Sequence, residues 1–186
     1  MLKAGMTKTE IEKELEGKGD YVQIDHLGRF LKEPGVALDT KKFVFLKLAE
    51  LYEKARMLND AAKMYENAAE LSIPFAEKIK HYMKETELYA KSGAFDRVEQ
   101  AMKKAMSQAN TREREEIKIS VKMFYKEQAR LSEAEGKRAQ AVRFYEKILE
   151  MRISEQERAE IAERLLYLYK SLGRIREYQA LEKSLG

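Results

Sequence analysis

A turn that recurs at a nearly fixed spacing is the feature that most constrains how this chain of 186 residues folds. Five turns separate stretches of helical pattern, and they lie 37, 37, 43 and 37 residues apart when aligned on Gly19, Arg56, Gly93, Gly136 and Gly173. A fixed period in this range is typical of stacked helical hairpins. Glycine suits four of these turns because it can end a helix in the left-handed conformation without strain from a Cβ atom.

The hairpin around Arg56 shows the pattern most clearly. Its apolar residues step by three or four positions, as in a helix that buries one face. We predict helices over residues 41–56 and 60–72, with Asp60 as the N-cap of the second. Pro74 ends the hairpin, because proline cannot continue the helical hydrogen-bond ladder. The stepped residues are Phe45, Leu48, Tyr52, Ala61, Tyr65 and Ala68.

The composition favours helices throughout. Charged residues make up 37% of the chain and apolar residues 44%, while only two prolines and nine glycines are present. A charged fraction above the usual value of about 25%, with Ala, Glu, Lys, Leu and Arg dominant, favours long helices over sheets. We therefore predict an all-α fold.

These residues resemble the tetratricopeptide repeat (TPR). That family places an aromatic residue, a Leu-small pair and a tyrosine on its first helix, matched by Phe45, Leu48-Ala49 and Tyr52. Its second helix has small, aromatic and small residues, matched by Ala61, Tyr65 and Ala68. The resemblance implies a right-handed α-solenoid of about four to five TPR-like hairpins over residues 41–186, and a role in protein binding. Later hairpins repeat part of the pattern, at Tyr82, Tyr89, Ala105, Tyr125, Ala129, Ala141, Tyr145 and Tyr169.

Residues 1–40 form a separate N-terminal hairpin in this reading. Thr7 and Glu10 have the spacing of a capping box, and Asp20 is a candidate N-cap for a second helix. The sequence leaves two interpretations open. The hairpin either caps the first full repeat and shields it from water, or it is a separately mobile binding arm.

The longer spacing between Gly93 and Gly136 marks the first candidate site. We predict a helix from Thr111, its N-cap, to Ala134, about 35 Å long. A basic row winds slowly around it, and three readings remain: a solvated face, a track for RNA phosphates, or a grip on an acidic peptide. The row, taken as the candidate partner-binding residues, consists of Arg114, Lys118, Lys122, Lys126 and Arg130.

The second candidate site is the C-terminal hairpin. Its first helix is apolar on almost every face and so needs cover on every face, whereas the end of a solenoid ordinarily has a polar outer side. We predict a two-fold homodimer interface here; the alternative is that the single last helix suffices. The predicted interface residues are Ile161, Leu165, Leu168, Leu172, Tyr178 and Leu181.

Residues for catalysis are scarce. There is no cysteine, only His26 and His81 supply imidazoles, and neither has a partner at ligand spacing. Phosphate-binding glycine loops and zinc motifs are also missing. We therefore expect no enzyme activity, no metal, no cofactor and no small-molecule substrate. The polar start and the short apolar stretches predict a cytoplasmic protein without a membrane span, and the lack of cysteine with many ion-forming residues resembles proteins of thermophiles.

The sequence thus predicts a non-enzymatic TPR-like scaffold that mediates protein–protein interaction as a homodimer. The alternative is a ribosome- or RNA-associated factor that docks through basic helices, with dimerisation bridging two particles. A net charge of +4 is compatible with both, because nucleic-acid binding depends on how charges cluster.

Overall fold

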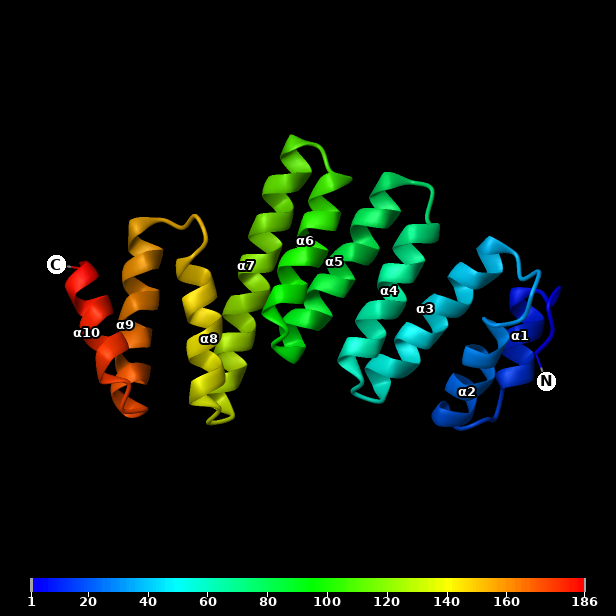
Figure 1. Ribbon diagram of the computed structural model, residues 1–186, viewed down its shortest axis with the longest axis horizontal. Coiled ribbons are helices and arrows are strands. Elements are labelled where there is room, and N and C mark those ends of the chain that lie inside the picture. Colours follow the sequence, from blue (N-terminus) through cyan, green and yellow to red (C-terminus); the bar gives the residue numbers. More distant parts are fainter. Residues whose placement is uncertain (1, 186) are drawn as a thin grey trace. The chain divides into compact units, whose positions relative to one another are not determined.

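The computed structural model describes residues 2–185, and all regular secondary structure within that range is α-helical (Figure 1). The predicted all-α class is therefore confirmed. The helices are α1 (Lys8–Leu15), α2 (Asp20–Phe30), α3 (Leu38–Lys54), α4 (Leu58–Leu71), α5 (Phe75–Ser92), α6 (Phe95–Ser107), α7 (Thr111–Ala134), α8 (Arg138–Leu149), α9 (Glu155–Ser171) and α10 (Ile175–Leu185).

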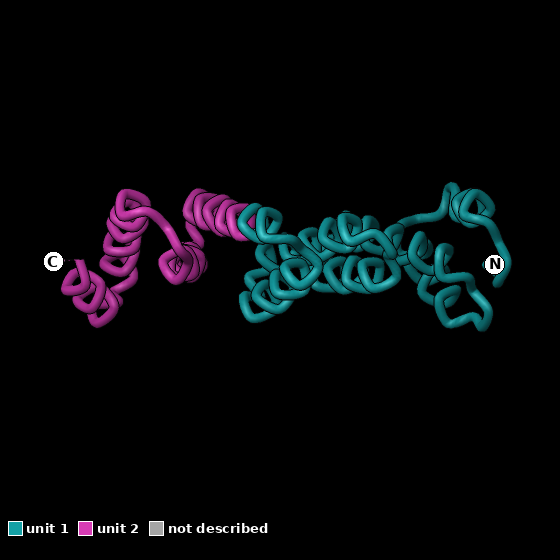
Figure 2. Tube along the Cα trace, turned by 90° about the horizontal axis from the view of Figure 1, so that it is seen from above, with its two compact units in different colours: residues 1–117 teal, residues 118–186 magenta. Residues whose placement is uncertain are grey.

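The chain divides into two compact units, residues 1–117 and residues 118–186 (Figure 2). In the first unit, helices α3 to α6 pack each on the next along the chain, and α2 packs on α3. In the second, α8 packs on α9 and α9 on α10. The division falls inside α7, so it differs from the boundary after residue 40 that the sequence suggested for the N-terminal hairpin.

Four turns share one backbone geometry. One or two residues after the first helix of each hairpin ends, a residue is left-handed, with φ between 62° and 72°. The amide of the following residue donates a hydrogen bond to the carbonyl five residues earlier, over 2.8–3.0 Å, as in a Schellman motif. The left-handed residues are Arg56, Gly93, Gly136 and Gly173. The prediction was wrong at Gly19, which is the extended N-cap of α2; there the left-handed residue is Gly17.

Small residues recur at fixed distances from these turns and are fully buried. Five residues after the turn lie Ala61, Val98 and Ala141, all with 0% exposure. Seven residues before it lie Ala49, Thr86 and Ala129, which are also fully buried. Small side chains at these positions let the two helices of a hairpin approach closely. The last hairpin departs from this pattern, since Tyr178 replaces the small residue and is only half-buried.

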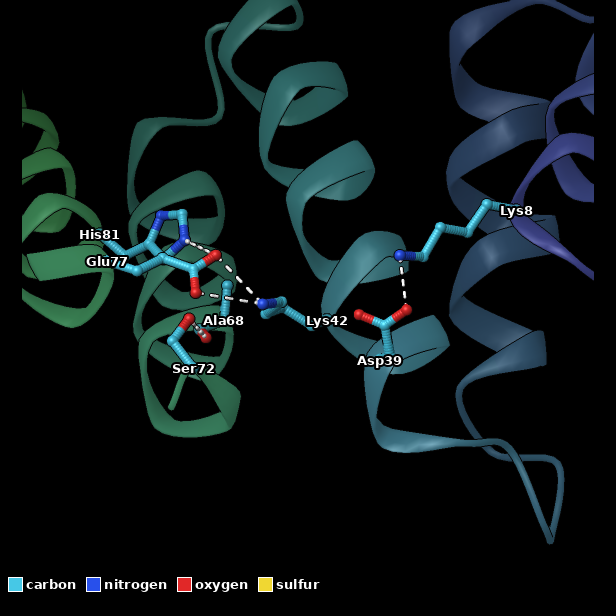
Figure 3. Close-up of polar contacts among 7 residues, drawn as sticks. All are labelled: Lys8, Asp39, Lys42, Ala68, Ser72, Glu77 and His81. Atoms are coloured by element: carbon cyan, nitrogen blue, oxygen red, sulfur yellow. Dashed lines mark hydrogen bonds and ion pairs between the residues drawn. The ribbon is translucent and has the colours of Figure 1, made fainter. Parts of the chain in front are cut away.

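The N-terminal helices share a core with α3. Buried side chains from α1 and α2, including Ile11, Leu27 and Phe30, form one cluster with Val44 and Leu48. Surface ion pairs connect the same elements, with Lys8 Nζ 2.6 Å from Asp39 (Figure 3) and Lys54 Nζ 2.9 Å from Asp20. This packing favours the cap over the mobile arm.

The predicted helix starts were only partly right. The capping box of Thr7 and Glu10 is confirmed, and so are the bounds of α7. Asp20 and Asp60 do not cap: each lies in the first turn of its helix, after Gly19 and Met57 respectively. At the start of α7 it is the side chain of Asn110, not Thr111, that accepts the amide of Glu113, over 3.0 Å.

No helix within residues 2–185 is long and apolar enough to cross a lipid bilayer.

Candidate functional site: a groove between α7 and α9

An open pocket of about 580 Å³ lies between α7 and α9 in the second unit. Both helices are the first of their hairpins, so they run in the same direction and present equivalent faces. Residues at two successive turns of α7 and of α9 form its walls, and one residue of α8 reaches it from below. The lining residues are Lys126, Arg130, Tyr145, Glu160, Ile161, Glu163, Arg164 and Tyr167.

The pocket has a buried floor and an aromatic wall. Tyr145 and Ile161 are only 7% and 6% exposed, and they close the bottom. The hydroxyl of Tyr145 donates a 2.5 Å hydrogen bond to Glu133, and burial together with this carboxylate raises the pKa of Tyr145. Tyr167, in contrast, is 58% exposed. The groove therefore offers a large aromatic surface to solvent.

The residues of the predicted basic row do not form one continuous surface, because they make different contacts. Arg114 lies in the first unit, where its Nε donates to the carbonyls of Met106 and Ala109 over 3.0 and 3.1 Å. The Met106 carbonyl lies in the last turn of α6 and the Ala109 carbonyl lies two residues beyond its end, where backbone acceptors lack helical partners. Arg114 thus helps to fix the connection between α6 and α7.

Two lysines of the row share one carboxylate. Lys122 bonds Glu157 of α9 over 2.8 Å, and Lys126 pairs with the other oxygen of the same residue. Hydrogen bonds from Lys122 and then Lys126 lower the pKa of Glu157, whose side chain is 14% exposed. This bridge joins α7 to α9 next to the groove and leaves a surplus of one positive charge.

The remaining row residues are exposed. Arg130 donates two hydrogen bonds, of 3.0 and 2.8 Å, to the carboxylate of Glu127 in the preceding turn of α7. Lys118 is exposed at the start of the second unit. Only Lys126 and Arg130 line the groove, so the structure brings together two of the five predicted residues. The role of the whole row in binding phosphates or an acidic peptide stays a prediction.

Three charged residues in the groove have no ion-pair partner within the described part of the chain, namely Glu160, Glu163 and Arg164. All three are exposed on α9. Arg164 was not predictable as a site residue, because one arginine in a charge-rich helix has no distinctive spacing. Its register was the available signal: Arg164 and Tyr167 precede Gly173 by nine and six residues, as Glu127 and Arg130 precede Gly136.

The charged side chains at the equivalent positions of the first unit form ion pairs with one another. Lys84 of α5 lies 3.1 Å from Glu53 of α3 and 3.4 Å from Glu87, which also binds Lys91. Lys84 and Glu87 precede Gly93 by the same nine and six residues. The charged side chains of α3 and α5 thus neutralise one another, whereas Glu163 and Arg164 of α9 have no ion pair within the described residues.

The excess of positive charge lies in the second unit. Residues 118–186 contain 15 Lys and Arg against 11 Asp and Glu, which gives +4. Residues 1–117 contain 21 of each and are neutral by the same count. The net charge of the whole chain is therefore a property of its C-terminal part.

The predicted dimer-interface residues divide into two groups. Ile161, Leu165 and Leu168 are 6%, 0% and 1% exposed and are buried within the chain itself, so they have little surface left for a second copy. Leu172 is 37% exposed, and Tyr178 and Leu181 are half-buried. Helix α10 has no buried residue at all. Any interface at this end must therefore use α10 and Leu172.

The histidines lie outside the groove. His81 is 7% exposed, stacks on Tyr65 with ring centroids 6.1 Å apart, and has Nε2 3.7 Å from Glu77. Lys42 holds the same carboxylate over 3.1 and 3.2 Å (Figure 3). Burial lowers the pKa of His81, which keeps it neutral near pH 7. No cluster of three or more His, Asp or Glu that could hold a metal occurs in residues 2–185.

Neither of two comparisons with known proteins identifies a relative of this chain. No family model matches it, and no curated protein matches it in sequence. What the chain binds is therefore inferred from its own geometry and charge.

Proposed function

We propose that this protein is a non-enzymatic, TPR-like scaffold that binds a segment of a partner protein in the groove between α7 and α9. One observation carries the proposal: the exposed aromatic side chain of Tyr167 and the side chain of Arg164, which has no ion pair, line the same pocket of about 580 Å³. Tyrosine and arginine are among the residues that most often dominate protein interfaces.

The repeated turns and the buried small residues support the TPR-like part of the proposal. Four hairpins have the same left-handed turn and three have the same fully buried positions around it. Repeats of this kind stack into a solenoid whose first helices line a continuous surface. We propose a right-handed α-solenoid of four to five hairpins, with α1 and α2 as its N-terminal cap.

The mixed charge of the groove favours a polypeptide over a nucleic acid. Glu160 and Glu163 line it together with Lys126, Arg130 and Arg164. A phosphate backbone has only negative charge and would be repelled by the two glutamates, whereas a peptide with charges of both signs can pair with both.

One observation favours the second candidate, an RNA- or ribosome-associated factor. The excess charge of +4 is confined to residues 118–186, which include four of the five basic-row residues. Basic residues that neutralise phosphates release counterions, so binding of this kind weakens steeply with salt.

A homodimer through the C-terminal end is a further part of the proposal. The apolar surface of Leu172, Ile175 and Leu185, which are 37%, 55% and 46% exposed, supports it. Light scattering at micromolar concentration is expected to give twice the mass of one chain, and a monomer at every concentration contradicts this part alone.

The two functions are separated by affinity capture with matched variants. Tagged protein is expected to retain a protein partner after nuclease treatment, and Arg164→Glu is expected to abolish the retention. Arg152→Glu, an identical charge change at an exposed residue that does not line the pocket, serves as the control and is expected to bind normally. Loss of all binding on nuclease treatment contradicts the scaffold and favours RNA. Equal binding by both variants contradicts the groove.

A further inference from the structure

A buried carboxyl group lies among helices α4, α5 and α6 of the first unit. Glu85 of α5 is 1% exposed, and its Oε1 accepts a 3.2 Å hydrogen bond from Lys104 of α6. Its other oxygen, Oε2, is buried without a hydrogen-bond partner. Lys104 also pairs with Glu66 of α4, so this one lysine connects three helices.

The surroundings of Glu85 contain more negative than positive charge. From α4, Glu66 and Glu70 both act on the Glu85 carboxylate, and from α6 only Lys104 opposes them. Tyr82 and Tyr89 of α5 are the other titratable neighbours; Lys104 lies 5.8 Å from the ring of Tyr82, and Arg97 lies 5.4 Å from that of Tyr89. The ammonium group of Lys104 therefore contacts two carboxylates, those of Glu66 and Glu85, and the carboxylate of Glu70 adds a third negative charge nearby.

A proton is the species that best relieves this imbalance. The ammonium group of Lys104 already bridges Glu66 and Glu85, and the residues described contain no cluster suited to a metal ion. A proton on Oε2 removes one of the negative charges and adds no bulk. Buried carboxyl groups with excess negative surroundings commonly stay neutral for this reason.

We propose that Glu85 is a proton sensor of the α4–α5–α6 core: its buried, unpartnered Oε2 takes up a proton, and loss of that proton converts the contact with Lys104 into an ion pair. Burial raises the pKa of Glu85 to about 7; Lys104 opposes the rise, and the carboxylate of Glu66 adds to it. In the ionised state Lys104 is held by charges on two helices, and in the neutral state its only ionic partner is Glu66. Proton uptake therefore loosens the link between α5 and α6.

The direct test follows the side-chain carboxyl carbons of the glutamates by NMR between pH 3 and pH 9, with Glu85→Gln to assign the signal. The expected midpoint for Glu85 is about two pH units above those of exposed glutamates, in line with the size of buried-site shifts. A midpoint among those of the exposed glutamates overturns the proposal.

Matched variants test the geometry. Lys104→Met is expected to raise the midpoint, because it removes the opposing charge, and Glu66→Gln is expected to lower it. Lys103→Met removes the same charge from the exposed neighbouring position and should leave the midpoint nearly unchanged. A midpoint that responds equally to the changes at 103 and 104, and not at all to Glu66→Gln, overturns the proposal. If Lys104→Met does not fold, the Glu66→Gln shift decides alone.

Discussion

The hydroxyl of Tyr65 on α4 donates a 2.9 Å hydrogen bond to the carboxylate of Glu53 on α3. Eighty residues later, Tyr145 makes the same bond to Glu133. In both hairpins the tyrosine follows the left-handed turn residue by nine positions and the glutamate precedes it by three. Hairpins α3–α4 and α7–α8 are thus alike in side-chain detail as well as in backbone.

We expect Tyr65→Phe to lower the free energy of unfolding by about 1 kcal/mol, since one hydrogen bond is lost while Lys84 still neutralises Glu53. Urea unfolding measures the change. The control is Tyr21→Phe, because Tyr21 is 71% exposed and its hydroxyl makes no bond within the described residues. Equal, near-zero effects of the two substitutions would show that the bond adds no stability.

Arg56 is the one non-glycine residue of the described chain with a positive φ, at 62°. We expect Arg56→Gly to stabilise the protein by about 0.5–1 kcal/mol, because relief of left-handed strain outweighs the greater freedom of glycine in the unfolded chain. Gly93→Ala, at φ 72° with open space around the added carbon, is expected to destabilise it by about 1 kcal/mol. Thermal unfolding of the two variants in opposite directions confirms the strain, and a loss of stability in Arg56→Gly contradicts it.

The bridge from Lys122 and Lys126 to Glu157 predicts a loss of stability in acid. A carboxylate whose pKa is lowered in the folded state stabilises the fold above its unfolded pKa of about 4.3, and this contribution disappears as the pH falls through the folded value. We expect Glu157→Gln to reduce the free energy of unfolding by about 1–2 kcal/mol at pH 7 and to flatten its fall below pH 4.5. Parallel curves for the variant and the native protein contradict this assignment.

The packing of α1 and α2 on α3 predicts a large loss of stability when a side chain of their shared core is truncated. Phe30 is 1% exposed in the core shared with α3. We expect Phe30→Ala to cost about 3–5 kcal/mol and to increase hydrogen exchange in α3 together with α2. A variant in which only α1 and α2 lose protection identifies a mobile arm instead. Val22→Ala, at a position 48% exposed, is the matched control.

Periodicity predicted the helices well, because burial of one face fixes the spacing of apolar residues along the chain. The bounds of α7 and the capping box of Thr7 followed from local sequence alone. The predicted N-caps Asp20 and Asp60 were wrong, because the preceding turn determines the start of a helix more strongly than the N-cap preference of one residue. The left-handed Gly17 and Arg56 determine where α2 and α4 begin.

The groove was only partly predictable. Lys126 and Arg130 were in the basic row, but the neutralisation of Lys122 and Lys126 depends on Glu157, 35 and 31 residues further along the chain. Likewise, the orphaned oxygen of Glu85 depends on three helices meeting around it. Such pairings arise from tertiary packing, which no local spacing reveals.

Site-specific photo-crosslinking from position 167 tests the central claim most directly. A benzoyl-phenylalanine in place of Tyr167 lies in the groove, and one in place of Tyr21, which is 71% exposed on α2, is the control. We expect position 167, and not position 21, to form adducts with one defined segment of a partner protein, and the addition of Arg164→Glu to suppress them. Adducts to RNA, or equal labelling from the two positions, would contradict the claim.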